Sequence, residues 1–165
     1  MPVTKTKDGM AAFERAVRDL VKNQVLVGIP AEDAARAPEP GEPSPINNAT
    51  IGYINEYGAP ERNIPARPHL IPGIEKVQAA ISNQLRRAGE AALNGSDGGV
   101  DRGLHAAGLV AQNSVKATIT EGGFAPLAER TLKARRARGR TGDKPLIDTG
   151  KYRDSIVYVI RRKGT

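Results

Sequence analysis

The sequence contains no cysteine and no tryptophan, and it has only two phenylalanines and four tyrosines. The lack of cysteine excludes disulfide bonds, thiolate nucleophiles and cysteine-ligated zinc. Because aromatic residues are so scarce, we expect the core of this 165-residue chain to be built from Ile, Leu, Val and Ala. No apolar run approaches the roughly 20 residues of a membrane-spanning helix. The N-terminal MPVTKTKDGM has no apolar signal-peptide region, and we expect no membrane partner.

Positive charge is concentrated at the C-terminal end of the chain. The net charge is +7, but residues 130–165 contain twelve Lys/Arg and three Asp/Glu and so carry +9. The remaining 129 residues contain thirteen Lys/Arg and fifteen Asp/Glu, which leaves −2. A basic segment of this kind favours contact with nucleic acid or with an acidic protein surface.

The spacing of apolar residues predicts a single α+β domain over residues 1–165, with several helices packed on a small mixed or antiparallel sheet. Asp8 is the expected N-cap of the first helix, and Gly58 is the expected residue after the second. The predicted helices cover residues 8–23, 48–57, 67–93, 100–120 and 126–138, followed by a helical turn near residue 153. The predicted strands cover residues 24–29 and 155–162, with the second strand central or well covered because it is apolar on both faces.

Two of these helices carry clear apolar stripes. In the helix over 67–93, which Pro68 opens, Pro72 lies within the first turns, so that the start can shift to Ile71. Residues 94–99 are expected to form a loop. The stripe of the 67–93 helix consists of Leu70, Ile74, Val77, Ile81, Leu85, Ala88 and Ala92. The inward face of the 100–120 helix consists of Leu104, Ala107, Ala111, Val115 and Ile119.

Residues 31–50 form a Pro-, Glu- and Ala-rich stretch in which Pro38, Pro40, Pro43 and Pro45 exclude regular structure. One interpretation is a surface loop. The other is an arm that becomes ordered against a neighbouring subunit.

No arrangement of residues marks a catalytic or metal site. The two histidines, His69 and His105, have no carboxylates at metal-binding spacing. No GxSxG turn supports a Ser–His–Asp triad, and the glycine-rich loop 95–99 lacks the lysine of a phosphate-binding loop. We therefore expect no enzyme activity and no cofactor. A hydrolase with an unrecognised site is the least favoured alternative.

The segment from residue 130 to residue 140 is the most basic part of the chain. It suits contact with an acidic partner or with DNA phosphates, and it is also compatible with a solvated helix. No aromatic residues are interleaved with its charges, so stacking on single-stranded bases is not expected. Its basic residues are Arg130, Lys133, Arg135, Arg136, Arg138 and Arg140.

Three separate segments of the chain carry a family resemblance. They are VLVGIP (Val25–Pro30), IGYINEYGAPERNIPARPHL (Ile51–Leu70), and PLAERTLKARRARG with KPLIDTGKYRDSIVYVI (Pro126–Gly139 and Lys144–Ile160). In their order and spacing these segments resemble the tail-completion and neck proteins of tailed phages, which include the HK97-type and Mu-type virion morphogenesis proteins. The chain departs from that pattern in its proline-rich stretch and in having Phe124 where many relatives have Trp.

The resemblance implies a small α+β fold and a structural role in the virion, at the junction of head and tail. It also implies a homo-oligomeric ring, for which a six-fold tail suggests six copies. The implied partners are tail terminator or tail tube proteins and head connector or stopper proteins, with assembly in the host cytoplasm. The alternative, based on the basic C-terminal segment, is a sequence-independent DNA-binding protein. In the phage interpretation, the same segment has non-specific contact with packaged DNA.

The residues of these segments suggest interface roles. Pro65 and Pro68 form a stiff segment around a protruding Arg67, which could pair with Glu56 or with a carboxylate of a neighbouring subunit. Asp148, Thr149 and Gly150 are expected to cap the helical turn that follows them. The interface candidates are Glu56, Tyr57, Arg67, the prolines Pro38, Pro40 and Pro43, and the six basic residues of 130–140.

Overall fold

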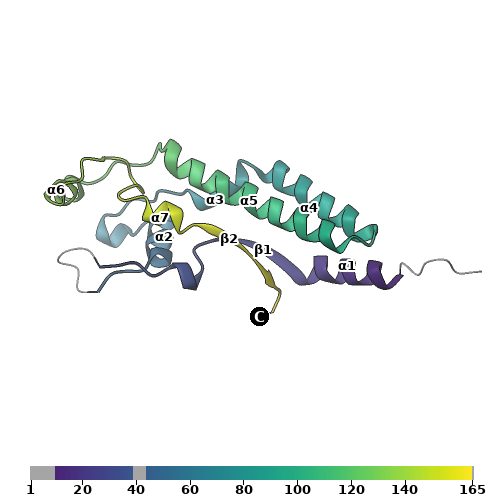
Figure 1. Ribbon diagram of the computed structural model, residues 1–165. Coiled ribbons are helices and arrows are strands. Elements are labelled where there is room, and N and C mark those ends of the chain that lie inside the picture. Colours follow the sequence, from purple (N-terminus) through teal and green to yellow (C-terminus); the bar gives the residue numbers. More distant parts are fainter. Residues whose placement is uncertain (1–9, 39–43, 165) are drawn as a thin grey trace, which may run out of the picture. The chain divides into compact units, whose positions relative to one another are not determined.

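The computed structural model describes residues 10–38 and 44–164, and there the chain forms helices and one two-stranded antiparallel sheet (Figure 1). This confirms the predicted α+β class. The α-helices are α1 (Met10–Lys22), α2 (Asn48–Tyr57), α3 (Leu70–Glu75), α4 (Gln78–Leu93), α5 (Asp97–Glu121), α6 (Glu129–Ala137) and α7 (Lys151–Asp154). The strands are β1 (Asn23–Gly28) and β2 (Val157–Arg162), and short 3-10 helices cover Ala31–Asp33 and Pro60–Arg62.

The chain divides into two compact units, each with its own core. The first unit comprises the described residues up to Leu26, Val77–Val110 and the residues from Tyr158 onward. The second unit comprises the described residues of Val27–Lys76 and of Ala111–Val157. Helix α5 and both strands pass from one unit into the other. The expectation of a single domain concerns independent folding, and it stays a prediction.

The core of the first unit is formed mainly by small residues. Helix α1 packs against α4, and the buried residues Ala16, Ala92, Val100 and Leu104 form one cluster (Figure 1). At Gly103, a Cβ atom would come within 2.6 Å of the Ala88 Cβ. Helices α4 and α5 can therefore approach this closely only because neither has a bulky residue at this contact.

The core of the second unit surrounds Val115, Ile119 and Ile156, each exposed by 1% or less. All five residues predicted to face inward from the helix over 100–120, which is α5 in the structure, are buried, and three of them lie in this unit. Partly buried apolar residues from β1 and the residue after it, from α3, and from α7 and the segment before it pack against this cluster. They are Val27, Ile29, Leu70, Ile74, Leu146, Ile147 and Tyr152.

The prediction of one helix over residues 67–93 is wrong. Helix α3 begins at Leu70 and not at Pro68, because the N–H groups around its first turn are bound by the Glu56 carboxylate. The helical path then breaks at Val77, whose backbone has φ −118° and ψ 16°. Of the predicted stripe, Leu85 is 41% exposed.

Several other element ends differ from the predictions. Helix α5 begins at Asp97, inside the predicted loop, and α6 begins at Glu129 and not at Pro126. Helix α2 agrees with its prediction, and Gly58 after it has φ 78°, as expected for a residue that ends a helix. The predicted N-cap Asp8 lies outside the described residues.

Strand β2 is not a central strand, since within the described residues the sheet has only two strands. It does pair with β1 as predicted. Its apolar residues are half-buried on both faces because helices supply the contacts that further strands would otherwise make. For example, a Cβ atom at Gly108 of α5 would lie 2.3 Å from the Tyr158 ring. Among the described residues, no helix is long and apolar enough to cross a membrane.

Glycines at two helical positions provide a stability test of the first unit. We expect Gly89→Ala in α4 to stabilise it by about 0.5–1 kcal/mol, because nothing lies within 4 Å of the added Cβ and alanine favours the helix. We expect Gly103→Ala in α5 to destabilise the unit by about 1–3 kcal/mol, because the same methyl group overlaps Ala88. Urea unfolding measures the free energy of unfolding of both variants, and equal changes would contradict the close packing of Gly103 against Ala88.

Candidate functional site

The carboxylate of Glu56 is buried in the second unit and binds the first turn of α3. Its Oε2 accepts hydrogen bonds from the backbone N–H groups of His69 (2.8 Å) and Leu70 (2.9 Å). Its Oε1 accepts from the N–H of Ile71 at 3.0 Å. Helix starts leave such N–H groups without intrahelical partners, so a side chain at the end of α2 caps a helix thirteen or more residues away.

The environment of Glu56 has opposing effects on its acidity. Burial by itself raises the pKa of the carboxyl group, because it penalises the charged form. The three backbone hydrogen bonds and the nearby His69 favour the charged form, and the net result is a pKa below the ordinary value of 4.5. Glu56 is therefore a buried anion at neutral pH.

His69 connects this cap to α7. The imidazole is only 2% exposed, with Nδ1 2.9 Å from the Arg67 carbonyl oxygen and 3.2 Å from Glu56 Oε2. Both neighbours of Nδ1 accept hydrogen bonds, which assigns a proton to that atom. In the neutral ring, Nε2 then accepts from the Tyr152 hydroxyl at 2.6 Å. The two rings also pack edge to face, with their centroids 5.6 Å apart.

The series of Glu56, His69 and Tyr152 has the outline of a carboxylate–imidazole–hydroxyl triad, but its chemistry is different. Burial, and secondarily the charge of Glu56, raise the pKa of Tyr152 well above that of a free phenol. The phenol therefore stays protonated and serves as a hydrogen-bond donor, and it is poorly suited to be a nucleophile. The arrangement is suited to holding three segments together.

Arg67 is not the protruding guanidinium that the sequence suggested. It is 6% exposed, and it donates from Nε to the Ala125 carbonyl (2.8 Å) and from Nη2 to the Pro126 carbonyl (2.9 Å). It thus braces the segment before α6, while Glu56 is occupied by backbone N–H groups. The predicted pair of Arg67 with Glu56 does not form, and the contact of Arg67 with a neighbouring subunit stays a prediction.

A pocket of about 310 Å³ lies beside this network in the second unit. Tyr152 and His69 form part of its wall, and α2 contributes two neighbouring tyrosines, Tyr53 and Tyr57. These are 68% and 59% exposed, and their ring centroids are 4.9 Å apart. The other lining residues are Gly28, Ile29, Ala49, Gly52, Glu56, Leu70 and Ile156.

Arg135 is another predicted surface residue that proves to be buried. It is 6% exposed, and its Nη1 donates to the carbonyl oxygens of Gly142, Lys144 and Ile147, each at 3.0 Å. Its Nε lies 3.5 Å from Asp148. Arg135 therefore holds the loop that follows α6.

Asp148 collects basic groups and does not cap α7. Arg140 binds its carboxylate at 2.6 Å, and the Arg138 guanidinium lies at 4.0 Å. The N-cap of α7 is Gly150, with φ 82°, and the hydroxyl of Thr149 before it accepts a hydrogen bond from the Lys151 N–H at 3.4 Å, so part of the predicted cap is present. A glycine takes this position because the left-handed conformation is strained for other residues.

The remaining interface candidates lie mostly at the surface. Arg130 and Lys133 are exposed, and Arg136 is exposed and pairs with Glu129 at 3.5 Å. Pro38 is exposed, whereas Pro40 and Pro43 lie outside the described residues. The sequence therefore predicted all of these residues at the surface. In the fold, some are buried and bind backbone groups, whereas others are exposed cations.

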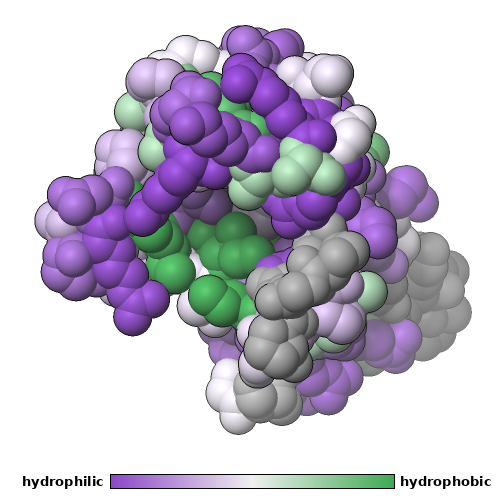
Figure 2. All heavy atoms as spheres, turned by 90° about the vertical axis from the view of Figure 1, so that its left-hand side faces the viewer, coloured by the Kyte–Doolittle hydropathy of each residue, from purple (hydrophilic) through white to green (hydrophobic). Residues whose placement is uncertain are grey.

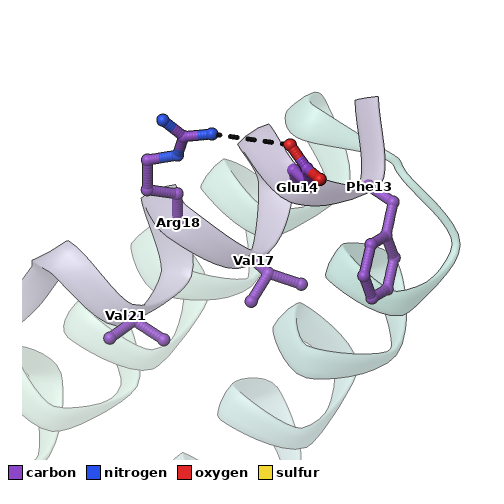
Figure 3. Close-up of a pocket in the computed structure, with 5 residues that line it drawn as sticks. All are labelled: Phe13, Glu14, Val17, Arg18 and Val21. Carbon is purple, nitrogen blue, oxygen red and sulfur yellow. Dashed lines mark ion pairs between the residues drawn. The ribbon is translucent and has the colours of Figure 1, made fainter. Parts of the chain in front are cut away.

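Two further surfaces carry apolar groups. Figure 2 shows the side of the second unit on which α6 lies, where hydrophobic residues gather in a hollow between hydrophilic ones. In the first unit, α1 has a shallow pocket lined by Phe13, Val17 and Val21, beside the ion pair of Glu14 and Arg18 at 3.9 Å (Figure 3). Val21 is 60% exposed.

No group of three or more metal-ligating side chains occurs within residues 10–38 and 44–164. The contact of His69 with Tyr152 and the capping role of Glu56 were not predicted from the sequence. No local signal marks Glu56 as a cap, because it lies at least 13 residues from the N–H groups that it binds, whereas the capping box of Ser/Thr and Glu spans only four residues. Only the folded chain brings these groups together.

No family model matches the chain, and searches of curated proteins and of solved structures found no match.

The role of Glu56 can be tested through the pH dependence of stability. Its pKa is depressed in the folded state, so its contribution is fully present above about pH 4.5 and is lost as the pH falls through the folded-state pKa. We expect Glu56→Gln to lower the free energy of unfolding at pH 7 by about 1.5–3 kcal/mol. The difference from wild type, measured by urea unfolding, should shrink below pH 4.5.

The matched control is Glu61→Gln, because Glu61 is exposed in the same unit. It should change stability by less than about 0.5 kcal/mol. A pH-independent effect of Glu56→Gln would show that the charge of the carboxylate is not what stabilises α3.

Proposed function

We propose that this protein is a structural subunit of a tailed-phage virion, located at the junction of head and tail. In this proposal it forms a homo-oligomeric ring that completes the tail and joins it to the head connector. The proposal originates in the resemblance of three segments of the chain to tail-completion and neck proteins.

The observation that carries the proposal is the way in which these three segments meet. From the second segment, Arg67 binds the carbonyl of Pro126, the first residue of the third segment, and that of Ala125 just before it, and His69 binds Tyr152 farther along the third segment. Val27 and Ile29, from the first segment, pack in the same core as Tyr152. The residues that carry the resemblance thus form one packed unit, which supports treating them as one module.

The chemistry of that unit also supports a structural role. Four of its buried ionic and polar side chains, Glu56, Arg67, His69 and Arg135, bind backbone groups of the same chain. Such groups rigidify a scaffold. Large apolar side chains remain exposed, among them Tyr53, Tyr57 and Ile71 in this unit, and exposed apolar surface favours association with partners.

The proposed partners are further copies of the chain, tail terminator or tail tube proteins, and head connector or stopper proteins. Closed cyclic symmetry is the economical way to place identical subunits around a tube, and a six-fold tail would take six copies. Assembly would take place in the host cytoplasm.

Deletion of the gene from the phage genome that encodes the chain tests this proposal. We expect filled heads and free tails to accumulate unjoined, as counted by negative-stain electron microscopy, and expression of the protein in trans to restore joined particles. Purified protein should contain closed rings in native mass spectrometry. Normal particles without the protein would overturn the proposal.

The second candidate is sequence-independent DNA binding, which is favoured by the exposure of Arg130 and Lys133 on α6. Two cations on one short helix suit phosphate contacts, and the rest of the C-terminal segment adds charge. This activity is also compatible with a subunit that lies near packaged DNA.

Charge reversal separates this candidate from the first. If DNA binding is the function, Arg130→Glu with Lys133→Glu should weaken binding to a random duplex at low salt by about tenfold or more, measured by fluorescence anisotropy. The matched control reverses Arg87 and Arg102, which are exposed in the first unit. Equal losses in both variants, or no binding by wild type, would remove the specific role of α6.

A further inference from the structure

We propose that the pocket beside Tyr53 and Tyr57 receives the proline-rich segment 34–46 of a second copy of the chain. This inference rests on the proposed function, because it names the contact by which neighbouring subunits would join. It combines a pocket, a segment and a constraint on that segment.

The pocket has the composition of a site for extended proline-rich chain. It is open to solvent, mostly apolar, and bordered by two exposed tyrosines of α2 whose rings lie 4.9 Å apart. Aromatic grooves bind polyproline II segments by packing proline rings between aromatic side chains. The tyrosine hydroxyls can donate to the carbonyls of the bound segment, which a polyproline II chain leaves without internal partners.

The same chain contains a suitable occupant. Residues 34–46 read AARAPEPGEPSPI, with prolines at positions 38, 40, 43 and 45. Proline fixes φ near −65° and so lowers the entropy that an extended segment loses on binding. Ile46, which is 45% exposed, adds an apolar side chain at the end of this segment.

The two ends of the segment are bound to each other. Asn48 donates its backbone N–H to the Ala34 carbonyl at 2.8 Å, and Arg36 Nε donates to the Ile46 carbonyl at 2.7 Å. These two bonds pin the departing and returning strands of chain to each other. Beyond them, Pro38 and Ser44 are exposed.

A second copy is favoured because the segment begins and ends close to the pocket of its own chain. Ile29, shortly before the segment, and Ala49, shortly after it, both line the pocket. Nine residues that leave and return at about 3.1 Å per residue can reach about 14 Å from the pinned base. A segment whose two ends lie near the rim of one pocket is therefore long enough to enter the pocket of an adjoining subunit, either reciprocally or around a ring.

The absence of cysteine in the chain allows a direct test by disulfide crosslinking. One full-length chain carries Ser44→Cys, and a second, tagged to differ in mass, carries Ala49→Cys, which leaves both tyrosines in place. After mixing and mild oxidation, we expect a mixed disulfide dimer with at least a fivefold higher yield than with Ala79→Cys as the second chain. Ala79 is exposed on α4. Replacing Tyr53 and Tyr57 with alanine in the Ala49→Cys chain should reduce the yield to that of the control.

A synthetic peptide of residues 34–47 provides the second measurement. Its binding to the full-length chain, followed by anisotropy of a peptide label, should weaken at least tenfold when its four prolines are replaced by alanine. Peptide binding without the mixed disulfide would point to a proline-rich segment of another protein and would overturn the inference. Rings that form normally with both tyrosines replaced would overturn it while leaving the proposed function intact. A mixed disulfide, combined with a failure of the protein to join heads to tails, would overturn the proposed function while leaving this inference intact.

Discussion

The second unit depends on a single buried carboxylate. Glu56 ends α2, receives three backbone N–H groups at the start of α3, and lies 3.2 Å from the imidazole of His69. A charge removed from water is costly unless hydrogen bonds replace its hydration, and here the backbone supplies them. The constraint acts in both directions: the anion needs these N–H groups, and they in turn determine where α3 begins. His69 and Tyr152 then extend the arrangement to α7.

Arginines perform the corresponding task for backbone carbonyl groups. Arg67 collects the carbonyls of residues 125 and 126, and Arg135 collects three carbonyls of the loop between residues 142 and 147. Guanidinium groups suit this role because their N–H groups radiate in a plane and remain charged when buried. Long irregular segments with few aromatic residues thus acquire fixed paths without a large hydrophobic core. Apolar and basic side chains therefore remain exposed at the surface.

Sequence reasoning succeeded where periodicity is long and local. The inward face of α5 was predicted residue by residue, and α2 matched at both ends, because i, i+3 and i, i+4 spacing reports directly on which face is buried. Predictions from the sequence failed where a group distant in the chain determines where a helix begins. The start of α3 is determined by Glu56, and the start of α6 follows an extended segment held by Arg67. Of the two alternatives predicted for the second strand, a central position is wrong, whereas a covered strand agrees with its half-buried residues, which helices contact.

By itself, the sequence determined the fold class, the positions of most helices, the pairing of two strands and the concentration of positive charge near the C-terminus. These follow from composition and from patterns within about twenty residues. Only the tertiary structure decided which charged residues are available to a partner. Glu56, Arg67 and Arg135 are buried among backbone groups from elsewhere in the chain, whereas Tyr57, Arg130 and Lys133 remain exposed. The type of a charged residue does not show whether it is buried or exposed. What decides this is whether the folded backbone offers the side chain enough hydrogen bonds to replace those it makes with water.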